Sequence, residues 1–331
     1  MAMTDAVRED AALERAPLPS RPAPSAYRYY RHTLPVRVMH WVNVLSLAIL
    51  LMSGLQIFNA HPMLYWGKSS YTGAPPLLEI TARAGENGQR IGVTRVLGHE
   101  FDTTGVLGLW TDADGNVNER AFPSWMTIPG QYWLSMARDW HLFFAWLFVL
   151  NGIAYVLYSI VSRHLSRDLV PTRAELRGVG ESMKDHLRFR HPRGEAARRY
   201  NVLQKLAYLL VIFGLLPLII LMGWAMSPAL NSVLPGWVDF FGGRQSARTI
   251  HFVVACLLVA FVAVHVFEVL ISGVLNHLRS MITGSFRIDP SDEPAAGRAT
   301  ADLSDQRGEP EPREHRESYE QQREQRLTGD E

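Results

Sequence analysis

The sequence predicts an all-α membrane protein, built as a four-helix transmembrane bundle with a long external loop that contains short strands. Three observations lead to this prediction: long apolar runs, strong segregation of charge, and turn-rich polar sequence between the first two runs. The runs are residues 38–58, 140–161, 202–226 and 250–275. Each is close to the roughly twenty residues that cross a bilayer as a helix. None carries Lys, Arg or Asp through its central turns, and soluble cores rarely need four helices of this length.

The distribution of charge predicts the sidedness of the bundle. The overall composition does not reveal this uneven distribution, because 47% hydrophobic and 20% charged residues give a mean hydropathy of −0.02. Ten Lys and Arg residues crowd the connection 162–201, whereas the connection 59–132 is mixed and slightly acidic. An excess of Lys and Arg marks the cytoplasmic side of a membrane. We therefore expect both termini and 162–201 in the cytoplasm, and 59–132 and 227–247 outside.

Composition divides the chain into three parts. Residues 1–34 form a polar cytoplasmic leader, and its start lacks the apolar segment of a cleavable signal peptide. Residues 35–285 form the four-helix domain. Residues 286–331 form a tail dominated by Glu, Arg, Gln and Asp, which we expect to be disordered and cytoplasmic. Cys256 is the only cysteine, which excludes an intrachain disulfide, a thiolate iron–sulfur cluster and covalent haem attachment through a CxxCH motif.

The loop 59–132 is too long to be a simple tether between two helices. Three of its runs have the composition of short strands, and a turn-forming sequence follows them. The strand-like runs are residues 77–84, 89–98 and 101–110, and the turn is DADGN at 112–116. The aspartates of the turn resemble a calcium loop, but Val117 stands where that motif needs glycine. The favoured interpretation is a small external cap that contacts a partner.

Four histidines lie within the apolar runs or their flanking turns, and they are His40, His141, His251 and His265. The fourteen-residue spacing of His251 and His265 puts both rings on one helix face, roughly 21 Å apart along the axis. Because successive spans alternate in direction, His141 lies at the external level of His251, and His40 at the cytoplasmic level of His265. Polar groups at such depth are costly and usually mark function.

Two bis-histidine b-type haems, one at each level, would satisfy all four rings. Neutral imidazole is a strong axial ligand for haem iron, and bundle cores house cofactors between facing helices. The simpler interpretation of any one of these histidines is an interfacial residue without a ligand role. The matching depths of the four histidines, the helix face that His251 and His265 share, and the spacing of the histidines together favour the haem hypothesis. Other histidines are expected to be solvated in loops and tails: His61, His99, His164, His186, His191 and His315.

An arginine precedes three of the four histidines by three residues, and these are Arg37, Arg138 and Arg248. On a helix this spacing puts both side chains on one face, with the arginine one turn nearer the interface. Haem propionates would point there, and arginine suits carboxylates by charge and forked geometry. Headgroup anchoring is the alternative, but two of the three lie on the external side, where positive-inside bias gives no reason for them. His265 lacks such an arginine and has Glu268 nearby instead.

These motifs resemble a known family. RVMHW at 37–41, RDWH at 138–141 and the H-x13-H pair look like the bacterial cytochrome b561 and nickel-hydrogenase b-type cytochrome family, and the formate dehydrogenase gamma subunit has a similar layout. The long loop, with YWGKSS after the first run, looks most like the thiosulfate reductase cytochrome b subunit branch. The resemblance covers about residues 30–285.

The resemblance implies that the pair in the fourth helix ligates two haems, each completed by a histidine from the first or second helix. It implies a multi-pass subunit of the bacterial inner membrane, which transfers electrons between the quinone pool and a periplasmic partner enzyme of molybdopterin oxidoreductase or hydrogenase type. No nucleic acid is among the expected partners. Protons would enter or leave at a quinone site near the inner haem, for which the candidates are Asn43, Ser46, Glu268 and His277.

Three alternatives stay open at this point. The chain could be a stand-alone cytochrome b561-like oxidase of superoxide or another small reductant, acting at the external haem. It could be a haem-free transporter whose histidines form a proton path, although no inverted repeat is visible in the sequence to support it. Finally, it could be a di-haem cytochrome that only anchors a partner enzyme.

Overall fold

The computed structural model describes residues 26–70, 73–188 and 200–289. This part of the chain contains four helical segments long and apolar enough to cross a membrane. They are α2 (Leu34–Asn59), α3 (Leu134–Val161), the continuous segment Val202–Ala225, and α10 (Arg244–Ile271). The third segment consists of α6 (Val202–Leu210), the π-helical η4 (Val211–Leu215) and α7 (Leu216–Ala225). The prediction of a mostly helical membrane protein with four spans is confirmed.

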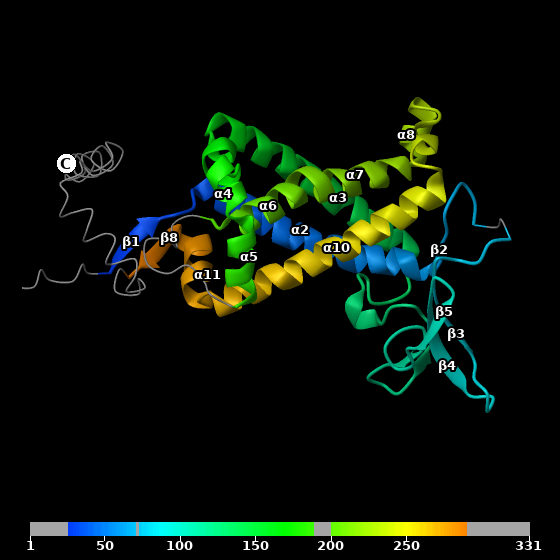
Figure 1. Cartoon of the computed structure of the whole chain (residues 1–331). Coiled ribbons are helices and arrows are strands. Elements are labelled where there is room, and N and C mark those ends of the chain that lie inside the picture. Colours follow the sequence, from blue (N-terminus) through cyan, green and yellow to red (C-terminus); the bar gives the residue numbers. More distant parts are fainter. Residues whose placement is uncertain (1–25, 71–72, 189–199, 290–331) are drawn as a thin grey trace, which may run out of the picture. The chain divides into compact units, whose positions relative to one another are not determined.

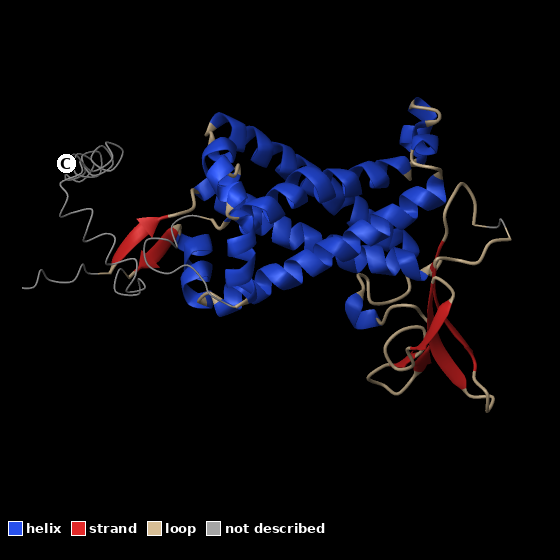
Figure 2. Cartoon of the chain, viewed as in Figure 1, coloured by secondary structure: helices blue, strands red, loops and turns tan. Residues whose placement is uncertain are grey.

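The spanning segments run side by side and alternate in direction, so the bundle has two ends (Figure 1). At the sheet end, α2 and α7 finish while α3 and α10 begin. At the terminal end, α2 and α6 begin while α3 and α10 finish. The segment between α2 and α3, residues 60–133, carries its strands at the sheet end, just past the ends of the helices (Figure 2).

Polar side chains fasten α2 to α3 near the terminal end. The amide of Asn151 in α3 donates to the carbonyl of Met39 at 2.8 Å and to the side-chain oxygen of Asn43 at 2.7 Å. Ser46, one turn further along α2, is fully buried. Small and amide side chains let helix backbones approach closely inside a membrane and hydrogen-bond across the contact. Asn43 therefore has a packing role in this interface, whereas the buried Ser46 hydroxyl has no hydrogen-bond partner among the described residues.

The third span is irregular where its sequence contains a proline. Pro217 stands in the first turn of α7, and the π-helical turn η4 directly precedes it. Proline lacks an N–H donor and collides with the carbonyl four residues earlier. A wider π turn removes that conflict without ending the helix.

Residues 60–133 form two small antiparallel sheets. The larger has the order β2-β3-β4-β5, and the smaller pairs β6 with β7. The strands are β2 (Met63–Leu64), β3 (Leu78–Ala84), β4 (Arg90–Val96), β5 (His99–Asp102), β6 (Trp110–Thr111) and β7 (Val117–Asn118). The first two predicted strands correspond to β3 and β4. The third, 101–110, is wrong as one strand, because Gly105 and Gly108 adopt positive φ angles and turn the chain between β5 and β6.

The DADGN sequence forms a turn. The carboxylate of Asp112 accepts the backbone N–H groups of Asn116 at 2.8 Å and Asp114 at 3.1 Å. The Asn116 N–H bond is the main reason that the pKa of Asp112 is lowered. Among the described residues no group of three or more His, Cys, Asp or Glu side chains is placed to hold a metal ion. The carboxylate of Asp112 thus serves the backbone of this turn.

A buried amide network attaches residues 60–133 to the end of α2. Gln56 is fully buried; its amide nitrogen donates to the Gln131 carbonyl at 2.7 Å, and its oxygen accepts from the Arg120 guanidinium. The side-chain oxygen of Asn59 accepts the N–H of Phe122 at 2.7 Å, and its amide nitrogen donates to the Phe122 carbonyl at 3.2 Å. Beside these amides, Phe58 packs with Phe122 in the apolar core of the sheet. The sheet is therefore a fixed extension of α2.

The same segment also caps α10. Gly243 precedes this helix and offers no side-chain cap, but the N–H groups of Gln245 and Ser246 donate to the Gly67 carbonyl at 3.0 and 3.2 Å. Gly243 has a φ of 102°, and a Cβ there would lie 2.8 Å from the Cα of Lys68. Only glycine permits this approach. The first turn of α10, whose orphan N–H groups need acceptors, is thereby held by a residue about 180 positions earlier.

Two short helices complete the sheet end, and several elements complete the terminal end. Between α7 and α10 lie α8 (Pro228–Val233) and α9 (Trp237–Phe240), and η1 (Ser124–Met126) precedes α3. Between α3 and α6 lie η2 (Leu165–Leu169), α4 (Arg173–Arg177) and α5 (Val179–Leu187). After α10 come α11 (Val274–Thr283) and β8 (Ser285–Ile288), and β8 pairs with β1 (Tyr27–Tyr30).

The sheet of β1 and β8 shifts the predicted boundaries of the terminal segments. Residues 27–30 of the predicted leader 1–34 are strand, and α2 begins at Leu34. Residues 286–288 of the predicted disordered tail are also strand, because they pair with β1 and bury Phe286 and Ile288. The remaining leader and tail, residues 1–25 and 290–331, lie outside the described residues.

Candidate functional site

His141 and His251 meet at the sheet end of the bundle. Each is the eighth residue of its helix, α3 and α10 respectively, and both helices begin at this end. The two ring centres are 6.2 Å apart and the ring planes are inclined by 58°. The fixed rise of a helix places both rings at the same depth, and the packing of the bundle turns them toward each other.

Hydrogen bonds to neighbouring helices assign the proton of each ring. The Nδ1 atom of His251 lies 3.0 Å from the Ile219 carbonyl, which can only accept, so this nitrogen carries the hydrogen. The Nδ1 atom of His141 lies 3.1 Å from the Ser53 hydroxyl. That hydroxyl donates its own proton to the Ile49 carbonyl at 2.6 Å, so His141 is the donor. Both Nε2 atoms therefore keep a lone pair, as metal-ligating histidines with a second hydrogen-bond partner do.

The separation of the rings fits one metal ion held between them. An imidazole nitrogen lies roughly 1 Å from its ring centre and about 2 Å from a metal that it ligates, so two ligating rings have centres about 6 Å apart. The observed 6.2 Å matches this value. Bis-imidazole ligation is typical of low-spin haem iron, and the helix-bundle setting suits a haem. The residues present thus fit a b-type haem at this position.

Glycines flank both rings. A Cβ at Gly54 of α2 would lie 3.4 Å from the Cε1 of His141, and one at Gly223 of α7 would lie 3.7 Å from the Cε1 of His251. Each imidazole therefore packs against the backbone of a neighbouring helix. Small residues at such contacts allow close helix approach in membranes, and here they also fix where the histidine rings stand.

His40 of α2 and His265 of α10 both lie toward the terminal end, and we refer to them as the second histidine pair. His265 stacks on Phe261, with ring centres 6.0 Å apart, and its edge meets Tyr208. The Nδ1 atom of His40 is buried and has no hydrogen-bond partner in the described part of the chain. A buried polar atom without a partner is costly, and ligation of a metal through this nitrogen would satisfy it.

The three arginines predicted near the haem propionates have different surroundings. Arg248 donates to the carbonyls of His61 at 2.5 Å and Met63 at 2.7 Å, so it ties α10 to residues 60–133. Arg37 donates to the carbonyl of Ile282 in α11. Arg138 is exposed on α3. Two of the three therefore bind backbone carbonyls in this structure, and their role toward propionates stays a prediction.

The four quinone-site candidates lie on three helices. Asn43 and Ser46 belong to α2, where Asn43 hydrogen-bonds to Asn151 of α3 and Ser46 is fully buried. Glu268 lies one turn after His265 on α10, and His277 lies on α11 with its ring 5.3 Å from that of Phe286. Both are at the terminal end, with the second histidine pair.

The sequence analysis missed the residues that position the rings. Ser53 is a lone hydroxyl within an apolar run, a signal that points to a buried polar contact, but nothing in the run says which helix it faces. Ile219 acts through its carbonyl, which carries no sequence signal at all. His32 was also not singled out. Burial, and then Arg31 and other histidines, lower the pKa of His32 from 6.5 to about 4.

Comparison with known proteins places these histidines in a family. Residues 31–284 match the family described as prokaryotic cytochrome b561. The chain belongs to the prokaryotic cytochrome b561 family. As a cytochrome b561 it is a membrane protein of a class that binds b-type haem and carries electrons. The predicted family is therefore confirmed.

One relative of this cytochrome b561 comes from Azospira oryzae and is provisionally named protein-methionine-sulfoxide reductase subunit YedZ1. It is 27% identical over 256 residues, which cover 77% of this chain and 97% of the relative. Its name is that of a methionine-sulfoxide reductase subunit and not that of a thiosulfate reductase cytochrome, the branch that the loop sequence resembles. No solved structure matches the chain.

Proposed function

We propose that this cytochrome b561 is a di-haem membrane subunit that links the quinone pool to a redox partner enzyme outside the membrane. His141 and His251 would hold one b-type haem, and His40 and His265 the other. The observation that carries the proposal is the 6.2 Å separation of the His141 and His251 rings, with each Nδ1 atom hydrogen-bonded. When bound, each haem supplies a one-electron carrier whose potential depends on its ligands and burial.

The chain contributes ligand geometry and shielding to this function. Ser53 and the Ile219 carbonyl hold the tautomers of His141 and His251, so that the same nitrogen of each ring is offered to the metal. Of the three predicted propionate arginines we keep Arg138 and Arg248 in this role, because Arg37 reaches α11 and donates to the Ile282 carbonyl there. Proton exchange with a quinone is assigned to the terminal end, where Glu268 and His277 accompany the second histidine pair, because the Asn43 side chain is already engaged by Asn151.

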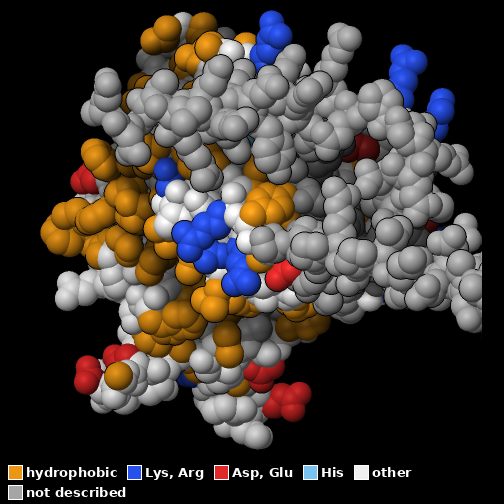
Figure 3. Space-filling view, turned by 90° about the vertical axis from the view of Figure 1, so that its left-hand side faces the viewer, with side chains coloured by type: hydrophobic (Ala, Val, Ile, Leu, Met, Phe, Trp, Pro, Cys, Tyr) orange, Lys and Arg blue, Asp and Glu red, His pale blue; other side chains and the backbone are white. Residues whose placement is uncertain are grey.

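Charge supports a cytoplasmic terminal end and an outer sheet end. Figure 3 looks at the terminal end and shows Lys and Arg side chains beside hydrophobic ones. On the positive-inside rule this end faces the cytoplasm of the bacterial inner membrane. The partner would then dock on residues 60–133 and on the α8–α9 segment at the other end. Lys68 and Asp239 join these two parts through an ion pair of 2.9 Å, so they present one continuous surface.

The alternatives have less support. The haem-free transporter conflicts with a family that binds b-type haem. The stand-alone oxidase has no counterpart in the relative, which is named as a subunit of a reductase. A molybdopterin oxidoreductase is the partner class that we favour over a hydrogenase, because the relative's name is that of an oxidoreductase subunit.

Haem counting tests the ligand assignment. We expect two b-type haems per purified chain by pyridine haemochrome assay, and a split low-spin absorption after dithionite reduction. His141→Ala and His251→Ala should each lose the same haem, and His40→Ala and His265→Ala the other. His99→Ala, in the exposed strand β5, is the matched control and should keep both. A His265→Ala variant with two haems would disprove the assignment.

Quinol reduction tests the link to the quinone pool. Protein in nanodiscs should be reduced by a quinol analogue, and Glu268→Gln and His277→Gln should slow that reduction while dithionite still reduces both haems fully. If quinol never reduces the wild-type haems, the chain is not quinone-linked. That result would favour the alternative in which the di-haem cytochrome only anchors a partner enzyme.

A further inference from the structure

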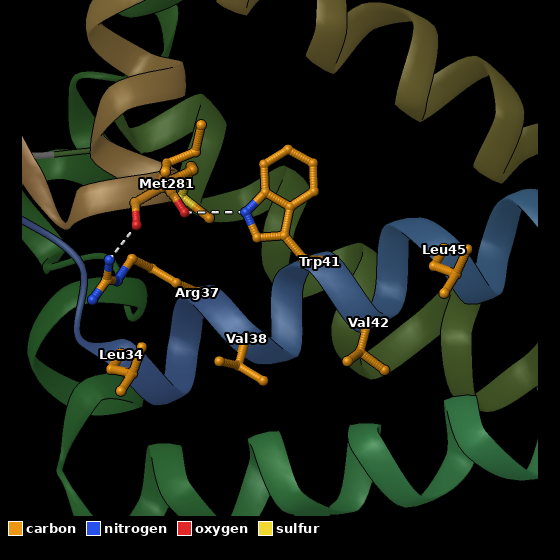
Figure 4. Close-up of a pocket in the computed structure, with 8 residues that line it drawn as sticks. Leu34, Arg37, Val38, Trp41, Val42, Leu45 and Met281 are labelled. Carbon is orange, nitrogen blue, oxygen red and sulfur yellow. Dashed lines mark hydrogen bonds between the residues drawn. The ribbon is translucent and has the colours of Figure 1, made fainter.

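A groove of about 460 Å³ lies at the terminal end, between the first turns of α2 and the last turn of α11. Its lining is apolar apart from Arg37 and the indole nitrogen of Trp41, and the apolar walls include Val38, Val42, Leu45 and Ile282. Figure 4 shows Arg37 and Trp41 reaching from α2 toward α11. His40 does not line the groove, so this is a different place from the histidine pair.

The contact between α2 and α11 fixes the walls of the groove. Trp41 donates its indole N–H to the Met281 carbonyl at 3.1 Å, and Arg37 donates to the Ile282 carbonyl (Figure 4). These carbonyls belong to the last turn of α11, where a helix leaves its acceptors unsatisfied and its dipole favours a cation. Gly284, with a φ of 85°, ends the helix just beyond them. The groove is therefore a built feature of the fold.

Arg37 brings a positive charge to the groove. Its guanidinium has five N–H donors, and one of them is used by the Ile282 carbonyl. No carboxylate forms an ion pair with it among the residues that the structure describes. Since the Ile282 carbonyl carries no net charge, Arg37 can still attract an anion.

The neighbouring face of α11 is suited to the membrane surface. Leu275, Leu278 and Ile282 lie on one side of this short helix and are exposed, Leu275 by 79%. Ser280, on another side, is buried against the protein. A helix with one exposed apolar face beside a spanning helix rests at the boundary between headgroups and acyl chains. The groove opens beside this face, at the depth where a lipid headgroup meets its chains.

We propose that the groove binds an anionic phospholipid, with its phosphate on Arg37 and one acyl chain along Val38, Val42 and Leu45. Arginine suits phosphate by charge and by its forked donors, and the groove has the size of small-molecule sites. A quinone suits it less well. The one ionisable lining residue is Arg37, and an arginine does not serve as a proton carrier in proteins, so no lining group can exchange the proton of a quinol. This inference does not depend on the number of haems or on the partner.

Lipid competition tests the proposal. Purified, delipidated full-length protein is offered equal amounts of phosphatidylglycerol and phosphatidylcholine, and retained lipid is identified by native mass spectrometry. We expect one retained phosphatidylglycerol, at about fivefold preference, the effect of one arginine at an anionic surface. Arg37→Gln should abolish the preference, and Arg37→Lys should keep part of it. Val42→Trp should fill the groove and reduce retention of both lipids.

Arg177→Gln is the matched control, because Arg177 is an exposed arginine of α4 at the same end. It should retain the wild-type preference. Circular dichroism establishes that each variant is folded, and the Arg37→Lys variant keeps the test valid if Arg37→Gln is unstable. The proposal is overturned if wild-type protein retains the two lipids equally, if the preference survives in Arg37→Gln, or if Val42→Trp retains both lipids as the wild type does.

Discussion

The rings of His141 and His251 lie 6.2 Å apart, although 110 residues separate them in the chain. Neither ring is positioned by its own helix alone. Ser53 of α2 holds His141 at 3.1 Å, and the Ile219 carbonyl of α7 holds His251 at 3.0 Å. All four spanning segments therefore contribute to this one pair, and its geometry depends on the packing of the whole bundle.

Replacing Ser53 should weaken the haem site at the sheet end. Ser53→Ala removes the acceptor of the His141 Nδ1–H, so the ring is freer to rotate and its Nε2 becomes less basic. Loss of such an outer partner typically lowers metal affinity about 10- to 100-fold. We expect faster loss of one haem to apomyoglobin and a changed midpoint potential for that haem alone, measured by optical redox titration.

Ser162→Ala is the control for Ser53→Ala. Ser162 also donates to the carbonyl four residues earlier, at 2.7 Å, but it touches no histidine. It should leave haem retention and both potentials as in the wild type. Equal behaviour of the two variants would mean that Ser53 acts only on its own helix.

Removing the buried amide of Gln56 should loosen residues 60–133. Gln56→Leu leaves the Gln131 carbonyl and the Arg120 guanidinium without their partner. Each buried group left unsatisfied costs about 1–3 kcal/mol. We expect faster hydrogen exchange and proteolysis over residues 118–133, with little change at the terminal end.

Gln131→Leu is the matched variant for this network, since Gln131 takes part only through its backbone carbonyl and its side chain is exposed. Its exchange pattern should resemble that of the wild type. Protection of residues 118–133 that is unchanged in Gln56→Leu would show that the apolar core alone holds the sheet.

His32 should make the terminal end sensitive to acid. Its pKa is lowered from 6.5 to about 4, chiefly by burial, so the folded protein favours the neutral ring. Between these two values the unfolded chain binds more protons, and stability therefore falls as the pH falls from 6.5 to 4. The apparent melting temperature of the wild type should drop across this window more steeply than that of His32→Gln. Parallel curves would contradict the assignment.

The ion pair of Glu175 and Lys205 should pin α4 to the third span. The Lys205 Nζ lies 2.8 Å from Glu175, and the lysine side chain is only 8% exposed. Glu175→Gln leaves this buried ammonium without a carboxylate, which costs about 3 kcal/mol, the lower end of the range for buried pairs because Glu175 is partly exposed. Unfolding in denaturant measures this loss. The double variant with Lys205→Met should recover most of it, and a double variant no more stable than Glu175→Gln would refute the pairing.

Sequence alone determined the number of spans and their limits to within about six residues, and it predicted that His141 and His251 lie at one depth. These properties are local, because hydropathy and run length fix a span and the helical rise fixes the depth of a residue along it. It also predicted β3 and β4 from their composition. It failed at residues 101–110, where glycine backbone angles outweigh strand-forming side chains, and at 286–288, where pairing with β1 orders the start of the tail.

Only the tertiary structure decided which faces meet. The rotation of one helix against another is set by packing over its whole length, so the partners of His141 and His251, the Gly67 carbonyl that caps α10, and the groove between α2 and α11 have no signal in a single run. Asn43 shows the same limit: its polarity predicts a polar contact, but only the structure shows that Asn151 of α3 makes one with it. Periodicity places a side chain on its own helix, and long-range contacts decide what that side chain touches.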